Sequence, residues 1–161
     1  IDDRPVIPDV DEKQISAEET FDNDIADPAR LHAEIVRLAD KAVSRLRAKK
    51  LTGGCVTVKI RRGDFTTYTR QRQVEPRTQE TRVVARIAAE LLDGWRKTQP
   101  QAALRLLGVG VSDLGEEVQA DLFGAPESTR NRQLDATVDA VREKFGSVAL
   151  RPASTIVKPR E

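Results

Sequence analysis

Apolar and polar residues alternate in four stretches of the chain, which is the pattern of β-strands that bury one face. In the first stretch, Ile15 and Ala17 fall on one side and polar residues on the other. A short turn around Gly63 and Asp64 joins the second stretch to the third, which predicts a hairpin, and Pro76 is expected to end the third. The four predicted strands are residues 13–21, 55–65, 66–75 and 103–114.

Two stretches with helical spacing separate these strands. The first is expected to begin with Asp27 as the N-cap and Pro28 as the first helical residue, and to end at Gly53 and Gly54. The second is expected to cover residues 79–97. The predicted buried positions are Leu31, Ile35, Leu38, Ala42 and Leu46 in the first helix and Val84, Ile87, Leu91 and Trp95 in the second.

The order strand, helix, strand, strand, helix, strand predicts an α+β fold, the β-α-β-β-α-β two-layer sandwich, with a four-stranded sheet and two helices on one face. The residues expected to point toward the helices are Val56, Val58, Ile60, Leu107, Val109 and Val111. The other face is expected to display Gln14, Ser16, Thr20, Thr57, Lys59, Arg61, Gly108 and Gly110. Hydroxyl groups, amides, cations and bare backbone suit contact with a phosphate backbone, although such a face can also be merely solvated.

Beyond the sandwich, residues 1–12 carry Pro5, Pro8 and a cluster of Asp, so we interpret them as a linker. Residues 129–145 predict an amphipathic helix that ends at Gly146. Its apolar side is expected to pack onto the domain, with an intermolecular contact as the alternative, and consists of Leu134, Val138, Val141 and Phe145. The remainder of the tail, residues 147–161, is expected to be extended or disordered.

The net charge of +1 conceals a strong polarity along the chain. Residues 1–34 carry eleven Asp and Glu against three Lys and Arg, whereas residues 45–72 carry nine Lys and Arg against Asp64 alone. Such a cationic stretch attracts polyanions in a salt-dependent way, or it is a solvated basic surface.

The single cysteine, Cys55, excludes an internal disulfide framework and fits a reducing compartment, so we expect the cytoplasm. No apolar run approaches a membrane span, and the absence of Met predicts a piece of a longer protein.

The chain offers no complete catalytic or metal site in its sequence. The one histidine, His32, lies in the first predicted helix without a nucleophile nearby, and residues 22–24 are interpreted as capping acids rather than metal ligands. Gly53 and Gly54 lack the flanking order and the lysine of a phosphate loop. We therefore predict no catalytic residue, no metal and no cofactor in this part of the protein.

RNA-recognition modules share the predicted topology and are the first alternative. They stack bases on aromatic side chains of the central strands. The segment RGDFTTYT resembles their motif only superficially, because Asp64 replaces an aromatic residue and Phe65 lies at the hairpin. The composition favours contact with a nucleic-acid backbone, and a stand-alone RNA-binding module remains the alternative function.

Three segments resemble the little finger domain of Y-family translesion DNA polymerases of the DNA polymerase IV type: KQISAEETFDNDI, VTVKIRRGDFTTYTR and LRLLGVGVSDL. The resemblance covers residues 13–114 in order, and IDDRPV resembles the tether from the thumb. It implies that residues 13–115 grip template-primer DNA. It also implies that the parent protein is a DNA-directed DNA polymerase, a nucleotidyltransferase whose palm holds Mg2+. This part would then not itself be the enzyme, and its partner would be the core of palm, finger and thumb in the same polypeptide.

The resemblance also implies particular DNA contacts on three strands. They fall on Gln14, Ser16 and Thr20, on Thr67, Thr69 and Arg70, and on Arg105, Gly108 and Gly110. They add to the contacts that the alternation itself suggests at Thr57, Lys59 and Arg61.

The segment QADLF is similar to the pentapeptide with which bacterial polymerases bind their sliding clamp, with Ala120 in place of a leucine. The resemblance implies a bacterial sliding clamp as partner and a clamp-binding peptide within residues 116–127, followed by a tail, residues 128–161. Its clamp-binding residues are Gln119, Asp121, Leu122 and Phe123. The alternative is that Leu122 and Phe123 pack back onto the domain, since exposed large apolar groups need a cover.

Overall fold

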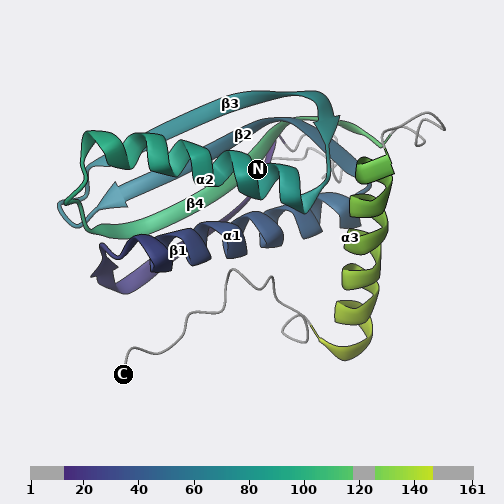
Figure 1. Ribbon diagram of the computed structural model, residues 1–161, viewed down its shortest axis with the longest axis horizontal. Helices are drawn as coiled ribbons and strands as arrows, with labels where there is room; N and C mark the ends of the chain where they lie inside the picture. Colours follow the sequence, from purple (N-terminus) through teal and green to yellow (C-terminus); the bar gives the residue numbers. More distant parts are fainter. Residues whose placement is uncertain (1–12, 118–125, 147–161) are drawn as a thin grey trace, which may run out of the picture.

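The computed structural model describes residues 13–117 and 126–146. The chain forms, in order, β1 (Gln14–Ile25), α1 (Pro28–Ala48), β2 (Leu51–Arg62), β3 (Thr67–Thr78), α2 (Thr81–Thr98), β4 (Leu104–Glu116) and α3 (Pro126–Phe145) (Figure 1). This order confirms the predicted α+β fold, including the extra helix after the last strand. Each strand of the structure is longer than its predicted counterpart or shifted by a few residues.

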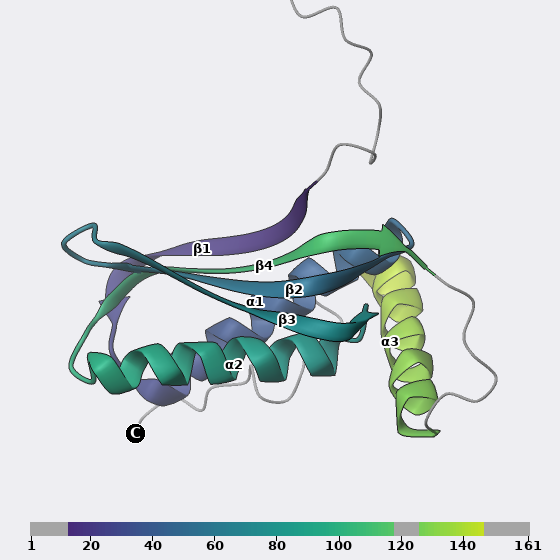
Figure 2. The same ribbon diagram turned by 90° about the horizontal axis from the view of Figure 1, so that it is seen from above.

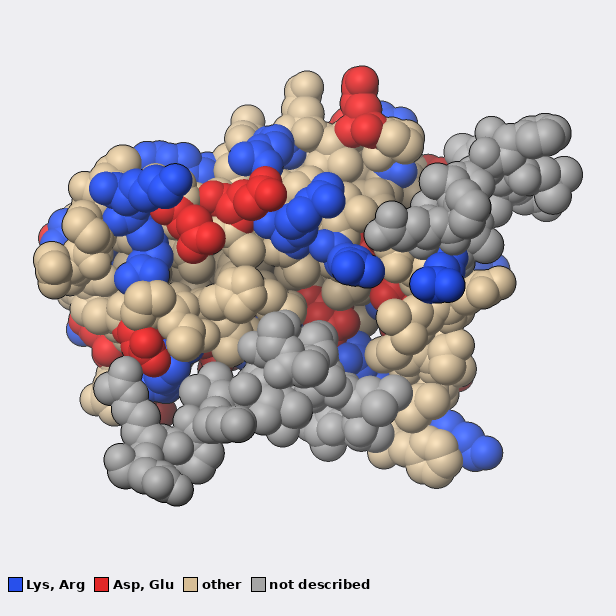
Figure 3. Space-filling view, in the orientation of Figure 1, with Lys and Arg blue, Asp and Glu red and all other residues tan. Residues whose placement is uncertain are grey.

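The four strands form one antiparallel sheet in the order β1-β4-β2-β3, so β4 and β2 are central and β1 and β3 are edges. Helices α1 and α2 lie side by side on one face of this sheet, which gives the predicted two layers (Figure 2). On the helix-covered side, cationic and anionic side chains are interspersed (Figure 3). The other face of the sheet, which we call the open face, carries no helix from residues 13–117 or 126–146.

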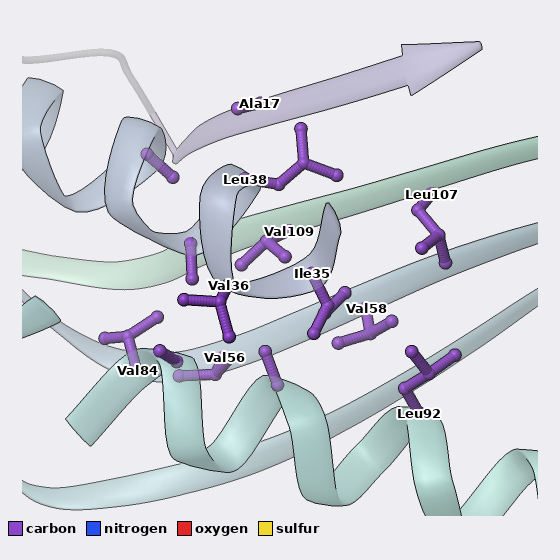
Figure 4. Packing of buried hydrophobic residues seen from close by; sticks show 14 of the residues in the cluster. Ala17, Ile35, Val36, Leu38, Val56, Val58, Val84, Leu92, Leu107 and Val109 are labelled. Atoms are coloured by element: carbon purple, nitrogen blue, oxygen red, sulfur yellow. The ribbon is translucent and has the colours of Figure 1, made fainter. Parts of the chain in front are cut away.

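The core lies between the sheet and the two helices (Figure 4). All six residues predicted to point toward the helices are buried, and so is the whole predicted stripe of α1. In α2, Trp95 is 1% exposed and its ring lies 5.2 Å from that of Tyr68. One predicted position differs, because Leu91 is only partly buried and Leu92 fills the core in its place.

The predicted role of the glycine pair is wrong. Helix α1 begins with Asp27 and Pro28 as expected but already ends at Ala48, and the chain reverses at Lys50, whose φ is 56°. Gly53 and Gly54 lie inside β2 instead. A Cβ atom on Gly53 would come within 2.0 Å of Cγ1 of Val111, so close packing against β4 accounts for that glycine.

Two predicted strand ends are also wrong, and both belong to edge strands. Strand β3 continues through Pro76 to Thr78, because an edge strand tolerates a residue that lacks a backbone N–H. Strand β1 continues to Ile25, with an irregular register after Thr20. The acidic residues 22–24 therefore lie within β1 rather than in front of the helix.

Helix α3 stands across the ends of α1 and α2 (Figures 1 and 2). It packs on the domain as predicted, but it uses the predicted side only in part: Leu134 and Phe145 are exposed, while Val138 and Val141 are half-buried. Its ion pairs with α1 come from Asp135, Asp139 and Arg142. None of the helices in the described ranges is long and apolar enough to cross a membrane.

Candidate nucleic-acid interface

The strand register assembles the open face from four rows of side chains that cross the sheet. Residues paired directly across antiparallel strands point to the same side. Ordered β1, β4, β2, β3, the rows are Gln14, Ser112, Cys55 and Gln73; Ser16, Gly110, Thr57 and Gln71; Glu18, Gly108, Lys59 and Thr69; Thr20, Leu106, Arg61 and Thr67. Hydroxyl and amide groups dominate these rows, and none of these residues carries an aromatic ring. The register thus confirms the polar face that the alternation predicts.

The two cations within the four rows, Lys59 and Arg61, have defined neighbours. Nζ of Lys59 lies 3.6 Å from Oε2 of Glu18, so this charge is partly balanced. Nε of Arg61 donates a hydrogen bond of 3.0 Å to the hydroxyl of Thr67. The face is therefore a mildly cationic surface whose donors are oriented, rather than a strongly charged patch.

Gly108 and Gly110 of β4 lie on the open face but do not offer bare backbone, contrary to expectation. Both are buried. The amide of Gln14 covers Gly110, where a Cβ atom would come within 1.9 Å of its Nε2. Gly108 lies between the side chains of Glu18 and Lys59. Neighbouring side chains fill the space that a missing Cβ leaves, so any phosphate at this position meets Gln14 first.

Two predicted DNA contacts do not lie with the others. Arg70 pairs with Val58, whose side chain is in the core, so Arg70 belongs to the helix-covered side, at the outer edge of the sheet. Its Nη1 donates to the carbonyl of Thr69, at 3.0 Å. Arg105 lies at a register shift of β4 and donates to Oδ1 of Asp24, at 3.3 Å. The remaining predicted contacts on the four strands come together on the open face.

The structure adds residues that the sequence reading left out of the site. Gln71, Gln73 and Ser112 lie on the open face, and Glu18 faces Lys59. The signal for the two glutamines was present in the sequence, because they continue the period-two pattern of Thr67 and Thr69.

The predicted clamp-binding residues Gln119, Asp121, Leu122 and Phe123 lie outside the described residues. The structure describes the chain up to Glu117, whose N–H donates to the carbonyl of Lys50, at 3.0 Å. Strand β4 therefore ends where β2 begins, beside Lys50 and Leu51. The described residues contain no group of three or more His, Cys, Asp or Glu able to hold a metal ion.

Comparison with known proteins places this fold and face in a family. The family model described as "impB/mucB/samB family C-terminal domain" matches residues 12–122. A relative from Streptomyces coelicolor, named DNA polymerase IV, is 43% identical over 129 residues, which are 80% of this chain and 26% of that protein. The chain thus spans about a quarter of that relative's length.

Two solved structures share the fold. One, described as an insertion ternary complex of Dbh DNA polymerase, has a TM-score of 0.58 and 12% identity, and covers 65% of this chain and 29% of that one. The other, described as a complex of the beta-clamp processivity factor and the little finger domain of PolIV, has a TM-score of 0.50 and 20% identity, over 70% of this chain and 99% of that one. At these identities the likeness concerns the fold.

The chain is thus a two-layer α+β domain with one helix-covered and one open face. It belongs to the impB/mucB/samB family C-terminal domain, which confirms the resemblance to the little finger of Y-family polymerases.

Proposed function

We propose that this chain is the part of a translesion DNA polymerase of the DNA polymerase IV type that grips template-primer DNA through the open face of its sheet. The observation that carries the proposal is the set of four rows, in which hydroxyl, amide and cationic groups from all four strands share one uncovered surface. Phosphate oxygens accept hydrogen bonds from such groups, whatever the base sequence.

The same face argues against the RNA-binding alternative. Modules that read single-stranded RNA present aromatic rings from their central strands. Among the residues of the four rows there is no ring, and Tyr68 lies on the helix-covered side, against Trp95. Backbone contact is therefore the better match to the chemistry of this surface.

The proposal extends to the whole protein and to its partners. Relatives named DNA polymerase IV support a parent DNA-directed polymerase whose Mg2+-dependent palm lies in another part of the polypeptide. The likeness to a little finger domain described in complex with a beta clamp supports a clamp partner, reached through Gln119, Asp121, Leu122 and Phe123. A short peptide binds weakly alone, and simultaneous contact with DNA raises its effective concentration at the clamp.

The DNA proposal is tested by charge reversal on the open face. Lys59→Glu with Arg61→Glu is expected to lower affinity for duplex DNA by about tenfold or more and to reduce the salt slope by about 2, measured by fluorescence anisotropy between low and high salt. The matched control is Arg70→Glu, which changes a cation on the helix-covered side of the sheet. Equal loss in both variants, or no loss in the double variant, contradicts the assignment of this face.

The clamp proposal has a separate test. Replacing Leu122 and Phe123 by Ala is expected to abolish binding to a bacterial sliding clamp in surface plasmon resonance, because both apolar anchors are lost. The control is Leu134→Ala, which removes an exposed leucine outside the peptide. Clamp binding that persists in the double variant refutes the peptide as the tether.

A further inference from the structure

Phe65 occupies an unusual backbone position at the tip of the β2–β3 hairpin. Its N–H donates to the carbonyl of Arg62 at 2.9 Å, and the N–H of Arg62 donates to the carbonyl of Thr66 at 3.0 Å, so a tight turn closes the hairpin. Phe65 follows this turn with a φ of 68°, in the left-handed region. Hairpins of this kind usually place glycine there, because a side chain is disfavoured at positive φ. The chain instead places a bulky ring there, 67% exposed.

A cation from β4, itself bonded to β1, contacts this ring from one side. The guanidinium of Arg105, from β4, lies 4.8 Å from the ring centroid. Nε of Arg105 in turn donates to Asp24 of β1, at 3.3 Å. Gly63 permits this approach, since a Cβ atom there would come within 2.1 Å of Oδ2 of Asp24. We call Asp24, Gly63, Phe65 and Arg105 the hairpin corner.

The hairpin corner adjoins the open face at its last row. The hydroxyl of Thr67 accepts a hydrogen bond from Arg61 and lies 3.5 Å from the carbonyl oxygen of Phe65. A large exposed ring therefore stands next to the cationic end of the four rows, whose own residues include no ring. Backbone preference does not account for a phenylalanine at this position, because the turn favours glycine, and the contact with Arg105 leaves most of the ring exposed.

We propose that Phe65 stacks on an unpaired nucleobase where the bound duplex passes into single strand. This inference rests on the proposed DNA-binding function and deepens it. One side of the ring is in contact with the Arg105 guanidinium, and the exposed remainder is available to a base. A ring beside phosphate-binding groups is the usual arrangement for holding single-stranded nucleic acid without reading its sequence. The hairpin corner thus recognises the junction, whereas the open face recognises the backbone.

The test compares two DNA probes with the isolated chain: a blunt duplex, and the same duplex with a single-stranded overhang. The unmodified chain is expected to bind the overhang probe more tightly by about fivefold or more, as one stacked base allows. Phe65→Gly is expected to lose this preference and to keep its affinity for the blunt duplex. Because glycine suits the turn, this variant is also expected to unfold at no lower denaturant concentration than the unmodified chain.

Phe65→Trp provides the matched variant, since it keeps a ring in the same place and is expected to keep the preference for the overhang. If the preference is absent in the unmodified chain, or persists in Phe65→Gly, the inference is overturned while binding to the blunt duplex still supports the proposed function. If neither probe is bound, both the inference and the proposed function fail.

Discussion

Helices α1 and α2 dock on the domain in one way and helix α3 docks in another. The first two bury apolar stripes against the sheet, and their largest side chain, Trp95, is almost fully enclosed. The third presents Asp135, Asp139 and Arg142 to the ends of α1 and α2, while Leu134 and Phe145 remain exposed. Apolar burial stabilises in proportion to area and with little directional preference, whereas charged contacts demand particular partners and are partly offset by desolvation.

Arg47 of α1 is the centre of the charged contact. Its guanidinium donates to Asp139 at 2.6 and 2.9 Å and lies 3.3 Å from Asp135, and it also donates to the hydroxyl of Thr81 and the carbonyl of Gln79, at 2.7 and 3.1 Å. Burial works against the charged form, but the carboxylates outweigh it and raise the pKa of Arg47 above its usual value. A single side chain therefore joins α1, α2 and α3.

Arg142 supplies the second attachment of α3. Its Nη2 lies 2.8 Å from Oδ2 of Asp40 on α1, and Nη1 donates to the hydroxyl of Ser44, at 3.3 Å. These charged contacts orient α3, and Val138 and Val141 beside them are only half-buried. From this difference we expect the sandwich to be stable through its core, and α3, which is oriented by charged contacts, to be separable from it.

The largest expected effect comes from the core. Trp95→Ala removes a ring that is 1% exposed, and it is expected to lower the free energy of unfolding by about 3–5 kcal/mol in a urea titration followed by circular dichroism. Leu134→Ala on α3 is the control and is expected to change it by less than about 0.5 kcal/mol. Similar losses in both would mean that α3 uses its apolar side after all.

The next effect separates α3 from the sandwich. Arg47→Ala leaves Asp135 and Asp139 without their shared cation, so α3 is expected to detach and its amide hydrogens to exchange at least about tenfold faster by mass spectrometry. The sandwich is expected to lose about 1 kcal/mol, from the bonds to Thr81 and Gln79. The control is Lys144→Ala, since that cation of α3 is exposed and its side chain lies against Phe145 of the same helix. Protection of α3 that survives Arg47→Ala would contradict this docking scheme.

The smallest effect distinguishes the two carboxylates that Arg47 binds. Burial raises the pKa of Asp135, and the charge of Arg47 offsets this only in part. Because the pKa of Asp135 is higher in the folded than in the unfolded chain, its protonated form favours folding. This contribution to the free energy of unfolding is fully present below the unfolded-state pKa and is lost as the pH rises through the folded-state pKa. At pH 7 the ionised Asp135 therefore opposes docking.

Asp135→Asn is accordingly expected to keep or slightly increase the protection of α3 at pH 7, since an amide oxygen can still accept from the N–H of Thr81. Asp139→Asn is expected to decrease it, because a charge-assisted bond to Arg47 is lost. The measurement is amide exchange at pH 5 and pH 7. In Asp135→Asn, the part of the pH dependence of α3 protection that is due to Asp135 should vanish, although the neighbouring carboxylates Asp139 and Glu80 are still present. If Asp135→Asn lowers the protection at pH 7 and Asp139→Asn does not, the burial argument is refuted.

Much of the fold could be predicted because its signals are local. Alternation in strands and helical spacing in α1 assign residues such as Val58 and Leu38 to the core without knowledge of their partners. The predicted ends of helices and strands were wrong where a neighbouring strand determines the structure. Gly53 looks like a helix terminator until β4 is placed against it, and Pro76 looks like a strand terminator until β3 is known to be an edge.

In the candidate site, too, local signals were predictable and contacts between distant segments were not. The polar face was predictable from period two, which places Ser16, Thr57 and Lys59 on one side of their strands. The register then corrected individual residues, because Arg70 falls on the helix-covered side and Gln14 covers Gly110. The clamp-binding residues stay a prediction, as they lie beyond the described part of the chain.

By itself, the sequence determined which side of each main strand and helix is buried, because that property depends on neighbours a few residues away and on the removal of apolar groups from water. Tertiary structure alone decided how α3 attaches and what surrounds Phe65. Arg47 and Asp139 are separated by 92 positions, and Phe65 meets Arg105 of β4, which is itself bonded to Asp24 of β1. Charged and aromatic contacts of this kind depend on geometry between distant segments, and no period along the chain encodes it.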